Sequence, residues 1–222
     1  MIDILIGRNA DDLHYLDIKF QRQSESHGRL SSIVGGLTSS PELLAAFTIA
    51  TVHVRPPASQ PVDPSLVVAD VQEIGRLLSV NCPLQSLHDE LFDILLRRND
   101  HHLAQINLYF RMKEGKDLYK IIRKSSTISK VTRKVAVHAI RSAIDLVDRD
   151  VALLRLALEG DGPMSRGNND VLGVRVCRMH WYRQHWLRVQ EGFRAVMNKN
   201  LLDVLKSKGG LFRDLMVALT RN

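Results

Sequence analysis

The stretch LFDILLRRNDHHLAQINLYF, residues 91–110, contains the pattern that decides the fold. Its apolar residues first recur at the three- and four-residue spacing of an amphipathic helix. A polar corner, RND at residues 98–100, interrupts that spacing. After the corner, Leu103, Ile106 and Phe110 resume it. The stretch therefore predicts two helices joined by a short turn.

The start of the chain repeats this pattern in IDILIGRNADDLHYLDIKF, residues 2–20. A single register superposes both the apolar spacing and the polar corner. A weaker copy lies in the last part of the chain, where Arg178 falls on Arg98 and Leu205 on Ile122. The pairs in the first register are Asp3 and Asp93, Ile4 and Ile94, Leu5 and Leu95, Arg8 and Arg98, Asn9 and Asn99, Leu13 and Leu103, Leu16 and Ile106, and Phe20 and Phe110. The chain therefore contains an internal repeat.

Composition limits the kinds of protein this can be. The 222 residues are 45% hydrophobic, which is enough for a globular core. No run of eighteen apolar residues occurs, so we predict no membrane-spanning helix, and the N-terminus has no basic leader typical of secretion. The two cysteines favour reduced thiols in a cytoplasmic protein. The formal net charge of +7 favours an acidic partner, either an anionic lipid surface or a nucleic acid.

The copies divide the chain into modules. Residues 1–52 form a partial repeat, residues 53–64 a proline-rich linker, residues 65–145 a full repeat and residues 146–222 a C-terminal repeat. We expect the helices of each module in the order long, long, long, short, long. The first module lacks its opening helix, which we interpret as a missing upstream segment. No alternation typical of strands occurs, so we predict an all-α fold whose units pack on one another.

Capping residues predict where several helices begin. A short helix is also expected at residues 30–34, and Asp89-Glu90 is expected at a helix start. The expected caps are Ser40 before Pro41, Ser65, the run Ser125-Ser126-Thr127, and Asp148 or Asp150.

Repeated five-helix units with the pattern DIL-x-x-R-[NS]-x-x-x-L at the second helix resemble the annexin repeat. The strongest matches are Asp93-Ile94-Leu95, Arg98-Asn99, Ile106, Gly115-Lys116-Asp117-Leu118 and Ile122, supported by the stretch LFRDLMVAL at residues 211–219. The resemblance covers essentially the whole chain. The linker resembles the one between the second and third repeats of a four-repeat annexin. The chain would then hold the second repeat without its first helix, the third and the fourth.

The resemblance implies an array of right-handed five-helix superhelices and a curved disc. It also implies calcium-dependent phospholipid binding by a cytoplasmic protein that associates peripherally with membranes. The implied calcium site combines a glycine-rich loop with a later carboxylate, because a hard cation prefers anionic oxygen. Here the loop positions read Pro83 and Gln85, and the carboxylate positions read Ser125 and, in the last module, about Lys208. In the first module that position falls near Leu37.

We therefore expect the family's calcium sites to be degraded. The sequence leaves open one weak site built from backbone carbonyls, at Gly162, Met164 and Gly167. A calcium-free route to an acidic membrane is available through basic residues on the loops expected to face it. Such residues contribute about 1 kcal/mol each near an anionic bilayer. The lipid-headgroup candidates are Arg123, Lys124, Lys130, Arg166, Lys206 and Lys208.

Other readings remain open. These basic residues are equally consistent with ordinary solvated surfaces, which would leave a helical protein-interaction scaffold without membrane binding. The segment around Trp181 and Trp186, interleaved with arginines, could be a core helix, a lipid interface or a nucleic-acid binder, the last being least favoured. His101-His102 is expected at the surface, and Cys82 as an inert thiol. No nucleotide-binding, nucleophile or metal-binding motif occurs, so we do not expect an enzyme.

Overall fold

The computed structural model describes the whole chain apart from residues 1, 9, 24–35, 37, 54, 58, 80–83, 160–165, 181, 208–209 and 222. Every regular element in the described part is a helix, and none of its residues lies in a strand. The predicted all-α class is confirmed. None of the described helices is long and apolar enough to cross a membrane.

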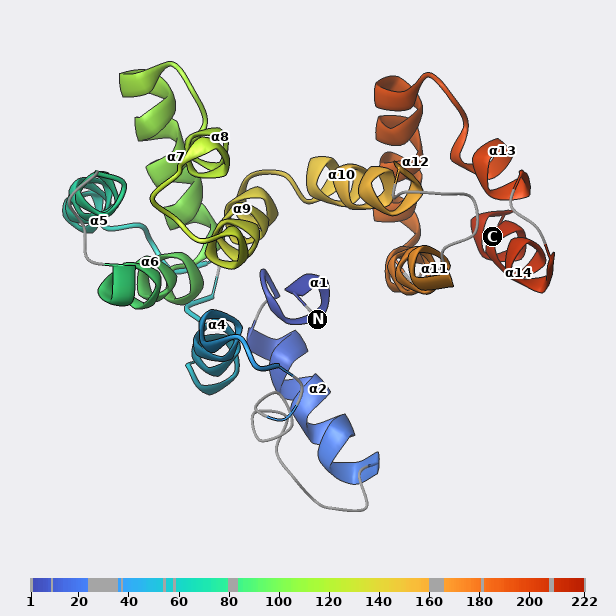
Figure 1. Ribbon diagram of the computed structural model, residues 1–222, viewed down its shortest axis with the longest axis horizontal. Helices are drawn as coiled ribbons and strands as arrows, with labels where there is room; N and C mark the ends of the chain where they lie inside the picture. Colours follow the sequence, from blue (N-terminus) through green and yellow to red (C-terminus); the bar gives the residue numbers. More distant parts are fainter. Residues whose placement is uncertain are drawn as a thin grey trace. The chain divides into compact units, whose positions relative to one another are not determined.

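The helices form two compact units, Met1–Ile144 and Asp145–Asn222 (Figure 1). The first contains α1 (Ile2–Leu5), α2 (Ala10–Gln23), α4 (Pro41–Val52), α5 (Pro64–Leu77), α6 (Leu84–Arg97), α7 (Asp100–Glu114), α8 (Leu118–Lys124) and α9 (Lys130–Ile144). The second contains α10 (Leu146–Glu159), α11 (Arg166–His180), α12 (Arg183–Met197), α13 (Leu201–Lys206) and α14 (Gly210–Arg221). We call α5–α9 the central repeat and α10–α14 the C-terminal repeat.

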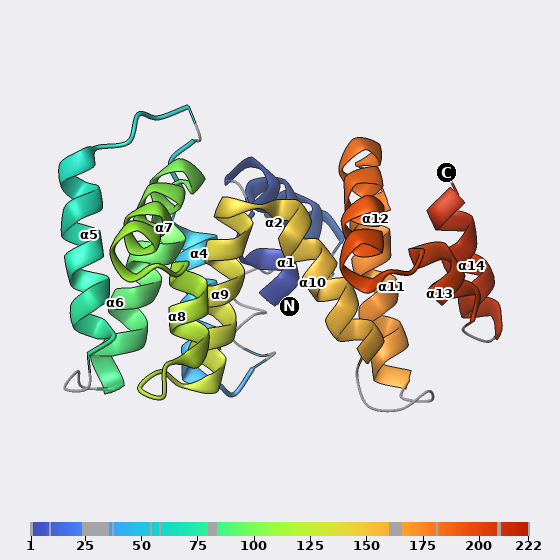
Figure 2. The same cartoon turned by 90° about the horizontal axis from the view of Figure 1, so that it is seen from above.

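Both repeats follow the same order of helix lengths. The fourth helix is short, spanning only Leu118–Lys124 in α8 and Leu201–Lys206 in α13. In the central repeat α6 and α7 each pack against α9, and α8 lies alongside α9 (Figure 2). In the C-terminal repeat α11 and α13 pack against α14, and α10 packs against α11 and α12. Five helices in the order long, long, long, short, long are therefore present in both.

The polar corner folds as the sequence indicates. Helix α6 ends at Arg97 and α7 begins at Asp100, with Asn99 as the N-cap between them. The Asn99 side chain accepts a hydrogen bond from the backbone N–H of His102 at 2.8 Å. The predicted cap at Ser40 is also confirmed, because its hydroxyl accepts from the N–H of Leu43 at 3.4 Å. A side-chain oxygen thus satisfies a first-turn donor in each case.

Three other predicted caps are wrong by a few residues. Asp63, not Ser65, caps α5, because Pro64 occupies the first helical position. Ser129, not the run at residues 125–127, accepts from Thr132 at the start of α9. Asp145, rather than Asp148 or Asp150, accepts from the first N–H groups of α10.

The pair Asp89-Glu90, expected at a helix start, instead lies within α6 (Leu84–Arg97), beyond the first turn where the positive end of the helix dipole favours carboxylates. The short helix expected at residues 30–34 falls outside the described residues. Each unit has its own hydrophobic core. In the second core Trp186, Val189 and Phe193 of α12 are buried, which favours the core reading of this aromatic helix.

Candidate anion-binding groove

An open groove lies on the central repeat, where α5 ends and α8 leads into the turn at residues 125–129. Its volume is about 690 Å³. One wall is apolar and formed by Leu78, Phe110 and Ile121. The rest is polar or charged. The other residues that line it are Gly75, Ser79, Glu114, Lys116, Lys120, Arg123, Lys124, Ser125, Ser126 and Thr127. We call this feature the basic groove.

Cations outnumber carboxylates around the basic groove. Among its described lining residues, Glu114 is the only acid and four are basic. Lys120 is neutralised locally, because its ammonium lies 2.8 Å from a carboxylate oxygen of Asp117. That hydrogen bond raises the pKa of Lys120 and lowers the pKa of Asp117. The basic groove is therefore positively charged at neutral pH.

The remaining cations are exposed and available to an incoming anion. In the described part of the chain, the side chains of Lys116, Arg123 and Lys124 make no ion pair or hydrogen bond. Arg123 and Lys124 also occupy the last turn of α8, where cations are favoured by the negative end of the helix dipole. Three guanidinium and ammonium groups thus point to solvent without a counter-ion among the described residues.

The sequence around α8 fixes where these cations sit. Asn107, which is buried in α7, accepts a hydrogen bond from the N–H of Leu118 at 2.9 Å and donates to Asp117 at 3.3 Å. Leu118 and Ile122 lie in the core, so the short helix is held by its apolar side. The basic residues of α8 are consequently left on the outer side of the helix.

The turn after α8 is where the annexin resemblance implies the anionic calcium ligand. The residue there is Ser125, whose hydroxyl lies 2.7 Å from the hydroxyl of Thr127 and whose carbonyl accepts from Arg133 at 3.0 Å. Neutral hydroxyls beside Arg123 and Lys124 do not fit a divalent cation, which prefers several anionic oxygens. The described residues contain no cluster of three or more potential metal-ligating His, Cys, Asp or Glu side chains.

The predicted lipid-headgroup candidates do not all gather at one place. Arg123 and Lys124 line the basic groove, whereas Lys130 is exposed at the start of α9 and does not line it. In the second unit Lys206 is exposed on α13, with its ammonium 3.7 Å from Asp203. Lys208 and the side chain of Arg166 lie outside the described residues.

The carbonyl-only calcium candidates are only partly described. Gly162 and Met164 fall outside the described residues. Gly167 lies in the first turn of α11 (Arg166–His180), so its carbonyl is oriented along the helix axis toward the helical hydrogen-bond ladder. That orientation does not favour coordination of a calcium ion by this carbonyl together with others of the loop.

A buried carboxylate organises the central repeat, and we did not predict it from the sequence. Asp70 of α5 accepts hydrogen bonds from Arg98 at 2.7 Å and contacts His102 Nε2 at 2.8 Å. His102 is buried, which corrects its predicted surface position, while His101 is exposed. The carboxylate joins the first helix of the repeat to the corner between the second and third.

The C-terminal repeat contains the same arrangement around a second aspartate. Asp150 of α10 accepts from Arg178 at 2.6 Å and contacts His185 Nε2 at 2.8 Å, and it also pairs with Arg149 at 2.8 Å. The signal in the sequence was the recurrence of Asp70 and Arg98 as Asp150 and Arg178 in one register. We interpret both clusters as structural, because their charges are satisfied internally.

The fold of the whole chain is similar to that of several solved structures. A structure of annexin A8 with an intact N-terminus matches with a TM-score of 0.81 at 17% identity, over 99% of this chain. Chicken annexin V matches with a TM-score of 0.76 at 17% identity, over 100% of this chain. The fold is annexin-like. Calcium-bound alpha-14 giardin shares this fold with a TM-score of 0.74 at 11% identity, over 99% of this chain.

The similarity to these structures shows the fold alone. The chain spans 65% of the length of annexin A8, 66% of chicken annexin V and 68% of alpha-14 giardin. No protein-family model matches the sequence, and no curated protein does. The resemblance inferred from the repeated DIL and RN motifs is confirmed at the level of the fold.

Proposed function

We propose that the chain binds peripherally to anionic phospholipid surfaces and that the basic groove makes the contact. The observation that carries the proposal is the set of exposed cations, Lys116, Arg123 and Lys124, beside an apolar wall. A glycerophospholipid offers a phosphate to the cations and the hydroxyl-rich turn, and a glycerol ester region to the apolar wall. The annexin resemblance implies the same general kind of partner.

The proposed contact is electrostatic and needs no calcium. Each lysine or arginine near an anionic leaflet contributes about 1 kcal/mol, so three give about 3 kcal/mol. That is roughly a hundredfold gain in binding over a neutral surface. The proposal includes a cytoplasmic location, because anionic lipid is concentrated on the cytoplasmic leaflet. It assigns a binding role and no reaction.

Vesicle sedimentation tests the proposal. The probe is vesicles of phosphatidylcholine containing about one fifth phosphatidylserine, at low salt and in the presence of a chelator, compared with pure phosphatidylcholine. We expect the chain to sediment with the anionic vesicles only. The double variant Arg123→Glu, Lys124→Glu should lose binding by a hundredfold or more, since each substitution replaces attraction by repulsion.

A charge-matched control separates the basic groove from net charge. Lys19 on α2 and Arg188 on α12 are exposed, and neither lines the basic groove. The variant Lys19→Glu, Arg188→Glu has the same change in net charge and should bind almost as well as the parent. An equal loss of vesicle binding in both variants would mean that overall charge causes the binding, and it would refute the role of the basic groove. Sedimentation that requires calcium would refute the calcium-free contact, and retention on DNA or RNA in preference to vesicles would favour the nucleic-acid alternative.

A further inference from the structure

The first unit contains a packed interface between two repeats, formed by the same two helices from each. Helix α4 packs against α6 and α9, and α1 packs against α4 and α9. In the five-helix order, α1 and α6 are second helices, and α4 and α9 are fifth helices. The caps agree: Ser40 accepts from Leu43 in α4 as Ser129 accepts from Thr132 in α9. We call the paired surface of a second and a fifth helix the 2/5 face.

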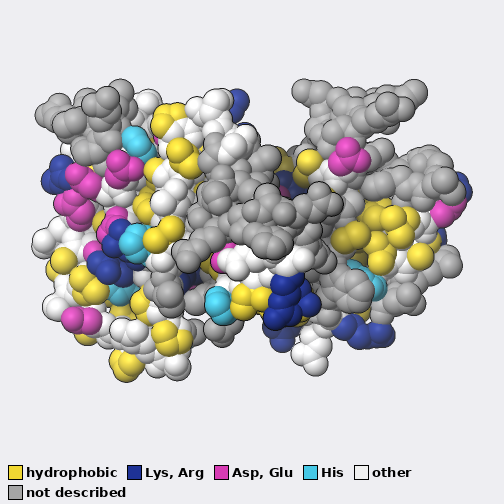
Figure 3. All heavy atoms as spheres, turned by 90° about the horizontal axis from the view of Figure 1, so that it is seen from below, with side chains coloured by type: hydrophobic (Ala, Val, Ile, Leu, Met, Phe, Trp, Pro, Cys, Tyr) yellow, Lys and Arg dark blue, Asp and Glu magenta, His cyan; other side chains and the backbone are white. Residues whose placement is uncertain are grey.

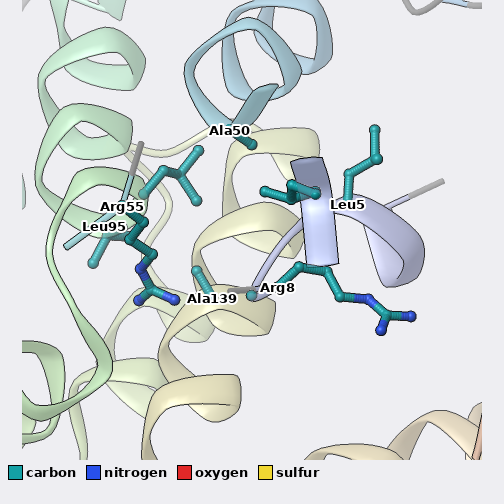
Figure 4. A pocket seen from close by; sticks show the side chains of 9 residues that line it. Leu5, Arg8, Ala50, Arg55, Leu95 and Ala139 are labelled. Atoms are coloured by element: carbon teal, nitrogen blue, oxygen red, sulfur yellow. The ribbon is translucent and has the colours of Figure 1, made fainter. Parts of the chain in front are cut away.

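The two 2/5 faces meet at equivalent residues. A small cavity of about 10 Å³ lies at their junction (Figure 4). Leu5 of α1, Ala50 of α4, Leu95 of α6 and Ala139 of α9 all line it. Leu5 falls on Leu95 in the register of the repeat, and Ala50 falls on Ala139 to within one position. Because each face contributes equivalent positions, the 2/5 face is self-complementary, as in a two-fold interface.

The C-terminal repeat has its own 2/5 face, on α11 and α14, which also pack against each other. The correspondence with α6 and α9 is fixed by structure as well as by sequence. Arg98 and Arg178 each pair with the buried aspartate of their repeat, which aligns the two second helices. The same alignment places Gly210, where α14 begins, on Lys130, where α9 begins.

Apolar side chains on this face are exposed where their counterparts are buried. Leu91 lies one turn before Leu95, and Val135 one turn before Ala139, so both share the side of the helix that reaches the junction. The counterparts of buried Leu91 (0% exposed), Ile94 (6%) and Val135 (0%) are Val171 (42%), Val174 (51%) and Leu215 (54%). Figure 3 shows hydrophobic side chains gathered over α11 and α14. An apolar patch of this kind is unusual on an isolated surface.

We propose that the 2/5 face of the C-terminal repeat binds the same face of a second copy of this chain, forming a two-fold symmetric dimer. The choice of occupant follows from the interface in the first unit, where one 2/5 face covers another. Valine and leucine at the exposed positions supply the apolar centre that such an interface requires. Arg213 and Asp214, which pair with each other and are exposed, provide a polar rim.

Analytical ultracentrifugation of the full chain over a concentration series tests the dimer. We expect a mass approaching twice the 25.1 kDa of the chain as concentration rises. The variant Val174→Gln, Leu215→Gln keeps the net charge and should raise the dimer dissociation constant at least tenfold. Because both side chains are half exposed, the variant should keep the helical circular dichroism of the parent. Its thermal midpoint should also match that of the parent at dilutions where both chains are monomeric.

Leu187 and Val196 on α12 provide a matched control, since they are 49% and 56% exposed but lie on the third helix. The variant Leu187→Gln, Val196→Gln should dimerise like the parent. A parent chain that stays monomeric at high concentration would overturn the proposal, and so would equal weakening by the control. The single variant Val171→Lys gives an independent check, with loss of the dimer expected and an unchanged dimer contradicting the inference.

Discussion

At the residue scale, Asp70 and Asp150 are buried carboxylates, each held by arginine and histidine partners. Asp150 is 1% exposed and is surrounded by Arg149, Arg178 and His185. Burial acts to raise the pKa of Asp150, but hydrogen bonds from His185 and Arg149 and the charges of Arg149 and Arg178 outweigh it. The pKa of this carboxyl is therefore held well below its usual range. The ionised form is an integral part of the native second unit.

We expect Asp150→Asn to destabilise the second unit by about 3 kcal/mol, because it removes the buried negative charge that pairs with the guanidinium groups of Arg149 and Arg178. Both tryptophans, Trp181 and Trp186, belong to this unit, so urea denaturation followed by tryptophan fluorescence reports on it selectively. Asp170→Asn, at an exposed position on α11, is the control and should change little.

The loss of stability in Asp150→Asn should depend on pH. A lowered pKa in the folded state means that the carboxylate stabilises the fold above its unfolded pKa of about 3.9. That stability is lost progressively as pH falls below this value toward the folded pKa. The difference in the free energy of unfolding between the parent and Asp150→Asn should therefore shrink as the pH falls below about 4. A gap that stays constant with pH would contradict the electrostatic account.

Residues whose partners are local could be predicted from the sequence, and those with distant partners could not. Asn99 was expected at the corner, because its cap bond reaches only to His102 in the next turn. His102 itself was placed wrongly, because its burial is decided by Asp70, which lies two helices earlier. Nothing in the spacing of His101-His102 indicates that contact.

At the scale of elements, the close approach of α12 to α10 gives a further prediction. A Cβ added at Gly192 would lie 3.0 Å from a methyl carbon of Val151 and 3.4 Å from one of Val147. Gly75, in α5, has no such neighbour within 4 Å. Gly75→Ala should stabilise the first unit by about 0.5–1 kcal/mol through helix propensity alone.

Gly192→Ala gains the same propensity but must displace Val151, which is buried. We therefore expect it to destabilise the second unit by about 1 kcal/mol net. Urea denaturation followed by tryptophan fluorescence measures the stability of the second unit. Denaturation followed by far-ultraviolet circular dichroism measures the stability of the Gly75→Ala variant. Stabilisation by both alanines would show that α10 and α12 are not tightly packed.

The elements themselves were largely predictable because helical periodicity is a local property. The order of long and short helices followed from the apolar spacing of each repeat. Helix starts were less certain, since several oxygens compete near each one. At α9, the residues Ser125, Ser126, Thr127 and Ser129 all could cap, and only Ser129 reaches the N–H of Thr132. Tertiary packing of the preceding turn decides among them.

At the scale of the whole molecule, the basic groove could not be predicted from the sequence, because the fold brings its lining residues together. Arg123 and Lys124 were expected from their place in the loop after the fourth helix. Lys116 and Lys120 were not predicted as part of a binding surface. Lys116 lies just before α8 and Lys120 lies within it, among the apolar residues of that helix. The apolar wall comes from α7, α8 and the end of α5, and no local pattern connects Leu78 with Arg123. The exposed 2/5 face was equally hidden, because it emerges only when burial is compared between repeats.

The two proposed surfaces differ in the force that each uses, so salt should separate them. Attraction between the basic groove and anionic lipid is screened over about 10 Å at 0.1 M salt and about 3 Å at 1 M salt. Burial of Val174 and Leu215 in a dimer is apolar and is not weakened by salt, and excluded salts strengthen it. Raising sodium chloride to about 1 M should therefore abolish sedimentation with anionic vesicles while the mass by ultracentrifugation stays that of a dimer. Loss of the dimer in parallel with vesicle binding would mean that charge, and not the apolar 2/5 face, holds the copies together.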